Sequence, residues 1–198
     1  MSPDRVAGVL LAAGLSSRLG ENKLFLRLGG QTLLRRAASA ALSAGLDEVQ
    51  VVLGHEHERA RAELAGLPVQ CVLNPEYARG MNSSLRAGIA ALPQSAAAAV
   101  VLLCDMPLVT GEMIADLVAR WRSAPAPLAV SLYGDVVAPP ILYTRALFPE
   151  LRALDDHGSG KRVVQQHRAE ALEVARPPDA LADLDLPEDL RALLGAQQ

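Results

Sequence analysis

The stretch that decides the fold is VLLAAGLSSRLGENK, residues 9–23. It opens with an apolar run of strand length and changes at Ala12, Ala13 and Gly14 into a loop of small residues. The loop carries two cations, Arg18 and Lys23, and Glu21 is its one acidic residue. Small residues after a strand let backbone N–H groups come close to a phosphate, so the pattern favours an anion-binding loop.

Composition narrows the classes of protein to consider. With 198 residues and 51% hydrophobic content, the chain fits one α/β domain over residues 1–198 better than two. No apolar run reaches the ~18 residues of a membrane span. The N-terminus lacks the basic start and cleavage pattern of a signal peptide, so a cytoplasmic location is expected. A net charge of −3 and an aromatic content of 3% argue against a nucleic-acid partner.

The two cysteines, Cys71 and Cys104, lie in apolar, strand-like segments. Neither belongs to a CxxC pair, so the sequence predicts buried free thiols rather than a zinc site.

Strand and helix patterns alternate along the chain. Strands are expected at 6–11, 48–53, 69–73, 98–104, 128–133, 136–143 and 171–174, and helices at 32–44, 56–65, 80–92, 110–121, 144–154, 160–167 and from 187. Thr32 and Thr110 are the expected N-caps of their helices. The alternation predicts a single-domain, Rossmann-like α/β fold with a mostly parallel sheet flanked by helices. In such a sheet, ligands bind beyond the carboxyl ends of the strands.

The two cations of the opening loop suit phosphate oxygens. Arg18 offers a planar fork of donors and Lys23 a point charge. The spacing is not that of a Walker A loop, because five residues separate Gly14 from Gly20 and Lys23 does not follow Gly20 directly. On the residues alone, an ordinary loop with solvated cations remains the alternative.

Two further segments place polar groups where a ligand could bind. Gly80, Asn82, Ser83 and Ser84 gather at a predicted helix start, where they would either receive an anion or serve only as caps. Asp105 ends the strand of VVLLCDMPLVT, residues 100–110. There its carboxylate would either share Mg²⁺ with substrate phosphates or stabilise a turn.

The segment LAAGLSSRLGENK resembles the L-A-A-G-x-S-x-R-x-G-x-x-K signature of nucleotidyltransferases with an NTP-transferase-like fold. Among these it is most similar to the molybdenum cofactor cytidylyltransferase family. The resemblance implies that the loop wraps the triphosphate of CTP and that Arg18 and Lys23 act on its phosphates. It implies further nucleotide contacts from Leu11, Ala12, Ala13 and Gly14.

The resemblance extends over nearly the whole chain. NPEYARGMNSSLRAG, residues 74–88, is similar to a family segment that adds Gly80, Ser83 and Ser84 to the nucleotide site. Asp105 matches the catalytic, metal-binding aspartate of a D-x-P segment, and the implied cofactor is Mg²⁺. LADLDLPEDL, residues 181–190, is similar to D-I-D-T-P-E-D-L, which makes Asp185 either a metal ligand or a partner of one.

The chain departs from the family pattern at two places. Leu186 replaces a threonine, and Ala138 stands where the family has the glycine of a G-x-P segment that faces the pterin. HGSGKR, residues 157–162, resembles a loop whose cations would hold either the acceptor phosphate or only solvent.

The resemblance implies a Mg²⁺-dependent enzyme that joins CMP from CTP to a molybdopterin-type cofactor and releases pyrophosphate. A molybdoenzyme or insertion chaperone is a further possible partner. The alternatives are a GTP-dependent guanylyltransferase, a cytidylyltransferase with another acceptor, and a non-catalytic cofactor carrier. Family members that use CTP carry L-A-A-G and those that use GTP carry L-A-G-G, so Ala13 indicates CTP. Lys23 is expected to gain its ionic partner only when nucleotide binds.

Overall fold

The computed structural model describes residues 5–14, 22–156 and 160–181. Its strands are β1 (Val6–Ala12), β2 (Arg27–Leu28), β3 (Gln31–Thr32), β4 (Glu48–Leu53), β5 (Gln70–Leu73), β6 (Ala98–Leu103), β7 (Leu128–Tyr133), β8 (Val136–Thr144) and β9 (Leu172–Arg176). Its α-helices are α1 (Leu33–Ser43), α2 (His57–Glu63), α3 (Met81–Ala91), α4 (Gly111–Ser123), α5 (Phe148–Arg152) and α6 (Lys161–Gln166). The predicted elements within this part of the chain are confirmed to within a residue or two, with one exception. The helix expected at 144–154 is a 3₁₀ turn over Arg145–Leu147 followed by the short helix α5. The helix expected from 187 lies outside the described residues.

The central sheet has seven strands in the order β5-β4-β1-β6-β8-β7-β9. The pairs of β1 with β4, β1 with β6, β4 with β5 and β7 with β9 are parallel. Strand β8 is antiparallel to both of its neighbours, β6 and β7. The sheet is therefore mostly parallel, as predicted, and its antiparallel member lies beside β6.

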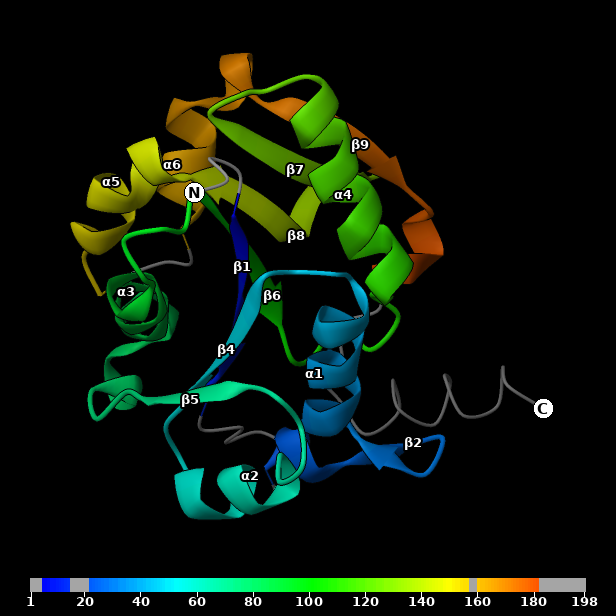
Figure 1. Cartoon of the computed structure of the whole chain (residues 1–198), viewed down its shortest axis with the longest axis vertical. Coiled ribbons are helices and arrows are strands. Elements are labelled where there is room, and N and C mark those ends of the chain that lie inside the picture. The colour runs from blue at the N-terminus through cyan, green and yellow to red at the C-terminus, as the bar shows by residue number, and fades with distance from the viewer. Residues whose placement is uncertain (1–4, 15–21, 157–159, 182–198) are drawn as a thin grey trace.

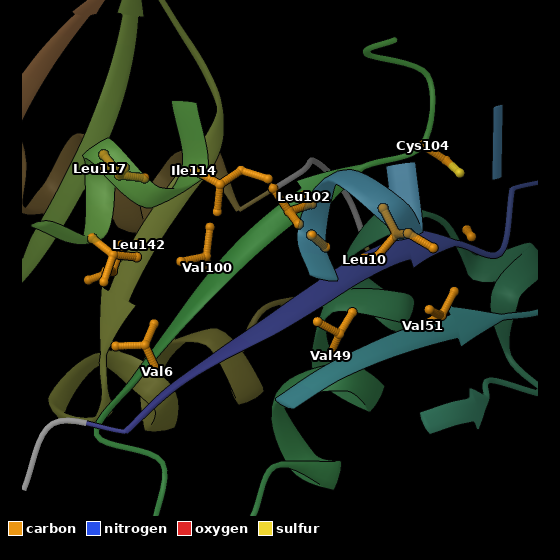
Figure 2. Close-up of a cluster of buried hydrophobic side chains, with 14 of the residues drawn as sticks. Val6, Leu10, Val49, Val51, Val100, Leu102, Cys104, Ile114, Leu117 and Leu142 are labelled. Carbon is orange, nitrogen blue, oxygen red and sulfur yellow. The ribbon is translucent and has the colours of Figure 1, made fainter. Parts of the chain in front are cut away.

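Helices cover both faces of this sheet (Figure 1). One buried cluster joins α1, α2 and α4 to strand residues such as Leu10, Val100 and Leu102, part of which Figure 2 shows. The other cluster joins α3, α5 and α6 to the alternate strand residues, including Val9 and Val101. Because successive strand residues point to opposite faces, burial on both faces requires the unbroken apolar runs from which β1 and β6 were predicted.

Local side chains fix where the helices begin. The Thr32 Oγ1 accepts a hydrogen bond of 3.2 Å from the Arg35 N–H at the start of α1. The Thr110 Oγ1 does the same for the Met113 N–H at the start of α4, also at 3.2 Å. Both predicted N-caps are therefore confirmed.

The β2–β3 hairpin was not predicted. Its strands have two residues each, too few for a pattern of alternation. Gly29 and Gly30 connect them with φ angles of 59° and 81°, the backbone of a type I′ turn. The hairpin lies between the opening loop and α1, and the Leu28 side chain is fully buried beneath it.

Helix α3 packs against the sheet through a glycine, Gly88, whose lack of a side chain permits the contact. A Cβ atom on Gly88 would lie 2.5 Å from the Val9 Cγ1 and 2.9 Å from the Val52 Cγ2. This contact packs α3 directly on β1 and β4. It thereby helps to position the start of α3 relative to the carboxyl edge of the sheet. None of the helices in the described part of the chain is long and apolar enough to cross a membrane.

Candidate nucleotide-binding site

Three segments meet at the carboxyl edge of the sheet. In the strand register, Ala12 of β1 lies beside Leu53 of β4, and Leu11 lies beside Leu103 of β6. The residues that follow these strands therefore emerge side by side. This is the edge at which parallel α/β sheets bind their ligands.

The opening of the loop after β1 is tightly packed on one side. Leu11, Ala12 and Ala13 are buried, and Gly14 is the first exposed residue. A Cβ on Gly54, just after β4, would lie 2.8 Å from the Ala13 carbonyl oxygen and 2.5 Å from the Tyr77 Cβ. A glycine is thus required at position 54 for the end of β4 to fit between Ala13 and Tyr77. A Cβ on Gly14 would meet no atom of the described residues within 4 Å.

Lys23 and Asp105 are in direct contact at this edge. The Lys23 Nζ donates a hydrogen bond of 2.5 Å to the Asp105 Oδ2, and the exposed fractions of the two side chains are 21% and 17%. The expectation that Lys23 gains its partner only on nucleotide binding is therefore wrong. The reason is topological, because the end of β6 brings a carboxylate next to a lysine 82 positions earlier in the chain.

Short local structures hold both members of this pair. Lys23 begins a 3₁₀ turn over Lys23–Phe25, in which the Asn22 Oδ1 accepts from the Leu24 N–H at 3.2 Å and Leu24 is buried. On the other side, Met106 is buried directly after Asp105. The carbonyl of Pro107 accepts a 2.8 Å hydrogen bond from the Arg36 Nε on α1. Arg36 thus fixes the turn that presents Asp105, a role for which its sequence context gave no signal.

Cys104 lies next to Asp105 but faces the core. Its side chain is buried among apolar residues of α1 and β1, as predicted (Figure 2). Burial raises the pKa of the Cys104 thiol, and the neighbouring Asp105 charge raises it further. The thiol is therefore neutral and inert at physiological pH. Cys71 is a second free thiol, only partly buried on β5.

The predicted serines at the start of α3 are buried within a hydrogen-bond network. The Asn74 Nδ2 donates to the Ser83 Oγ at 2.9 Å and to the Ser84 Oγ at 3.0 Å. The Ser83 hydroxyl in turn lies within hydrogen-bond distance of the Glu76 and Gly80 carbonyl oxygens. Gly80 is the N-cap, with no side-chain cap bond and with φ at 107°. The serines therefore shape this turn from within, while Gly80 lies at its exposed surface.

Asn82 connects the start of α3 to a distant segment. Its side chain is 1% exposed, donates to the Asp155 carbonyl at 2.9 Å, and accepts from the Gly160 N–H at 2.9 Å. Two arginines reinforce the connection. Arg86 and Arg79 each form a 2.6 Å ion pair with the carboxylate of Asp156. They lower the pKa of Asp156, and the hydrogen bond from Arg86 is the largest cause.

Several predicted residues fall elsewhere. Arg18, Asp185, Leu186 and the His157 end of the HGSGKR segment lie outside the described residues. Arg162, at the start of α6, is 3.6 Å from the Asp155 carboxylate. Ala138 packs against the cluster that contains Tyr133 and Met106, the residue after Asp105. The Tyr133 hydroxyl donates to the Pro139 carbonyl at 2.9 Å.

The possible metal ligands at this edge fit a magnesium ion that is also bound by substrate phosphates. They fit less well a metal ion held by protein side chains alone. The described residues contain no group of three or more His, Cys, Asp or Glu side chains that could hold a metal. Asp105 supplies a partly exposed carboxylate at the end of β6. Mg²⁺ commonly takes one or two protein carboxylates and fills its other positions with water and phosphate oxygens, so a single described carboxylate is compatible with it.

The fold and this edge define an α/β protein of the nucleotide-binding class. The profile of the family described as "MobA-like NTP transferase domain" matches residues 8–171. The chain therefore belongs to this family of nucleotidyltransferases.

Proteins similar to the chain along its whole length carry several names. It is 32% identical over 194 residues to the purine catabolism protein PucB of Bacillus subtilis (strain 168), covering 92% of each chain. It is 29% identical to nicotine blue oxidoreductase of Paenarthrobacter nicotinovorans, covering 96% of each. The crystal structure of Rv0371c from Mycobacterium tuberculosis H37Rv matches with a TM-score of 0.86 and 29% identity, over 98% of this chain and 100% of that one. A second structure of Rv0371c, in complex with manganese, matches with a TM-score of 0.81 and 26% identity, over 97% and 99% of the two chains.

Proposed function

We propose that the protein transfers a cytidylyl group from CTP to a molybdopterin-type molybdenum cofactor and releases pyrophosphate. The observation that carries this proposal is the meeting of Lys23 and Asp105 beside Ala13 and Gly14 at the carboxyl edge of the sheet. These are the cation, the carboxylate and the small-residue backbone that the transfer requires, contributed by segments far apart in the sequence.

The reaction needs little from a general base. An oxygen of the acceptor's terminal phosphate attacks the α-phosphorus of CTP, forming a new P–O–P bridge. The bond from that phosphorus to the β,γ-pyrophosphate breaks, and pyrophosphate leaves with the electron pair. Because the attacking oxygen is already anionic, positioning and charge neutralisation supply most of the catalysis.

The chain's own residues would divide these tasks. Lys23 and Arg18 neutralise charge on the triphosphate, the backbone of residues 11–14 and Gly80 contacts the nucleotide, and Ser83 and Ser84 hold the turn around Gly80. Asp105 and Asp185 would hold Mg²⁺, which when bound neutralises charge on the phosphates. A structure of the similar protein Rv0371c was solved in complex with manganese, which supports the choice of a divalent cation as cofactor.

Ala13 favours CTP over GTP in this proposal. Its methyl group is buried, 4% exposed, and its carbonyl packs against the backbone at Gly54. By the family resemblance an alanine here marks the users of CTP, and we infer that the added methyl group leaves a larger purine less room at this backbone. A misfit of roughly 1–3 kcal/mol gives about 10–200-fold discrimination.

The test is to incubate the protein with Mg²⁺, the molybdenum cofactor and each of the four nucleoside triphosphates at equal concentration. The expected product, identified by mass spectrometry, is the cytosine dinucleotide, formed about 10–200-fold faster than any other. The matched variant Ala13→Gly introduces the glycine of the family members that use GTP. It should reduce the preference for CTP over GTP. Faster turnover with GTP would overturn the choice of nucleotide. Absence of product with every nucleotide would favour a carrier or a different acceptor.

A further inference from the structure

We propose that Lys23 occupies the metal-binding carboxylate of Asp105 until the metal–nucleotide complex arrives, so that metal and nucleotide bind as one unit. This inference rests on the proposed function, because it assigns Asp105 to a divalent cation and Lys23 to phosphates. Its basis is the contact between the Lys23 Nζ and the Asp105 Oδ2 at 2.5 Å.

The two side chains stabilise each other when no ligand is bound. Their exposed fractions, 21% and 17%, mean that most of each side chain has left water. An ammonium or a carboxylate in such surroundings is costly without a partner of opposite charge. The buried anchors on either side, Leu24 and Met106, keep the two groups facing each other.

A free divalent cation would therefore bind at a disadvantage. To reach the Asp105 carboxylate it must displace the Lys23 ammonium and so break this ion pair, with nothing supplied in return for the lysine. A metal–triphosphate complex avoids this cost, because it brings a cation for Asp105 and phosphate oxygens for Lys23 together. The ion pair is thus exchanged for two new pairs in one event, which makes metal and nucleotide binding mutually favourable.

This exchange predicts that removing the Lys23 charge strengthens metal binding. Lys23→Met removes the competing ammonium while keeping an aliphatic stem of similar length. In the absence of nucleotide, it should tighten binding of Mn²⁺ alone by about 5- to 10-fold. A lysine that only supports the fold would not improve metal binding when removed.

The experiment is a titration of the full chain with Mn²⁺ alone, followed by the EPR signal of the free ion. The wild type, Lys23→Met, Asp105→Asn and the double variant form a double-mutant cycle. The tightening caused by Lys23→Met should disappear in the Asp105→Asn background, because the carboxylate that the lysine blocks is then gone. Arg152→Met removes one exposed positive charge on α5 and serves as the matched control, with unchanged affinity.

A second measurement reports the exchange directly. The sequence contains two lysines, Lys23 and Lys161, so in Lys161→Arg protein labelled with ¹⁵N-lysine the one remaining ammonium signal belongs to Lys23. This signal should shift when Mg²⁺ and CTP are added together and much less with Mg²⁺ alone at the same concentration. Equal shifts under both conditions would contradict binding as one unit.

The outcomes separate the two hypotheses. If Asp105→Asn weakens Mn²⁺ binding but Lys23→Met leaves it unchanged or weakens it, the exchange is wrong and the metal role of Asp105 stands. The exchange is also wrong if the tightening persists in the double variant, because the effect is then a general change in charge. If Asp105→Asn binds Mn²⁺ like the wild type, the metal role itself fails, and with it this part of the proposed function.

Discussion

The roles of single residues at the candidate site depend on contacts with residues that are far away in the sequence. Lys23 and Asp105 were each selected from the sequence, yet their contact joins positions 82 residues apart and follows only from the order of the strands. Gly54 and Arg36 gave no signal at all. Their importance comes from a close approach to Tyr77 and from a hydrogen bond to Pro107, both of which exist only in the folded chain.

Asp156 provides a prediction at this scale. Arg86 and Arg79 lower its pKa in the folded protein, so its ion pairs stabilise the fold above the unfolded value of about 3.9. This stabilisation is lost as the pH falls through the lowered folded pKa. Asp156→Asn should lower the melting temperature by a few degrees at pH 7, and the difference should fade in acid.

Melting curves of the two proteins between pH 7 and pH 2 check this expectation. Asp135→Asn, which removes an exposed carboxylate in the turn between β7 and β8, is the matched control and should change little. A difference between wild type and Asp156→Asn that stays constant with pH would show that charge is not its source.

At the scale of elements, buried strands and capped helices could be predicted because their signals are local. The apolar runs of β1 and β6 and the threonine caps of α1 and α4 needed no knowledge of the fold. The apolar pattern of β8 is the same for either strand direction. The two-residue connection between β7 and β8 allows only an antiparallel hairpin, so this local signal for the direction of β8 was missed. The serines at the start of α3 were predicted from position, but their burial behind Asn74 depends on packing.

Gly88 provides a prediction for the contact between α3 and the sheet. Alanine is a better helix former than glycine by about 1 kcal/mol, so propensity alone predicts that Gly88→Ala stabilises the protein. The structure predicts the opposite, because the new Cβ would lie 2.5 Å from the Val9 Cγ1. We expect a net loss of roughly 1–3 kcal/mol in the free energy of unfolding.

Urea unfolding of Gly88→Ala, Val9→Ala and the double variant measures this contact. Val9→Ala removes the methyl group that the new Cβ meets, so the double variant should be more stable than the sum of the two losses predicts. A stabilised Gly88→Ala protein would mean that α3 is not held at this distance from β1.

At the scale of the whole molecule, the strand order explains how the site assembles. Placing β1 between β4 and β6 brings the ends of three strands to one edge, so residues as far apart in the sequence as Ala12 and Asp105 share a site. The α/β class and the sheet edge that binds ligand could be predicted from the alternation of strands and helices. The family came from the spacing in the opening loop. The internal ion pair could not be predicted, because it depends on the distance between two loops.

The most direct test of the proposed site is to measure the turnover of Asp105→Asn across a range of Mg²⁺ concentrations. The substitution keeps the size of the side chain and removes its charge. We expect turnover with CTP to fall by at least about 100-fold, with no recovery at moderate Mg²⁺, while Asp135→Asn behaves like the wild type. Melting temperatures of all three proteins establish that they are folded. If folded Asp105→Asn keeps the wild-type rate and metal dependence, Asp105 only stabilises a turn, and the proposed site is wrong.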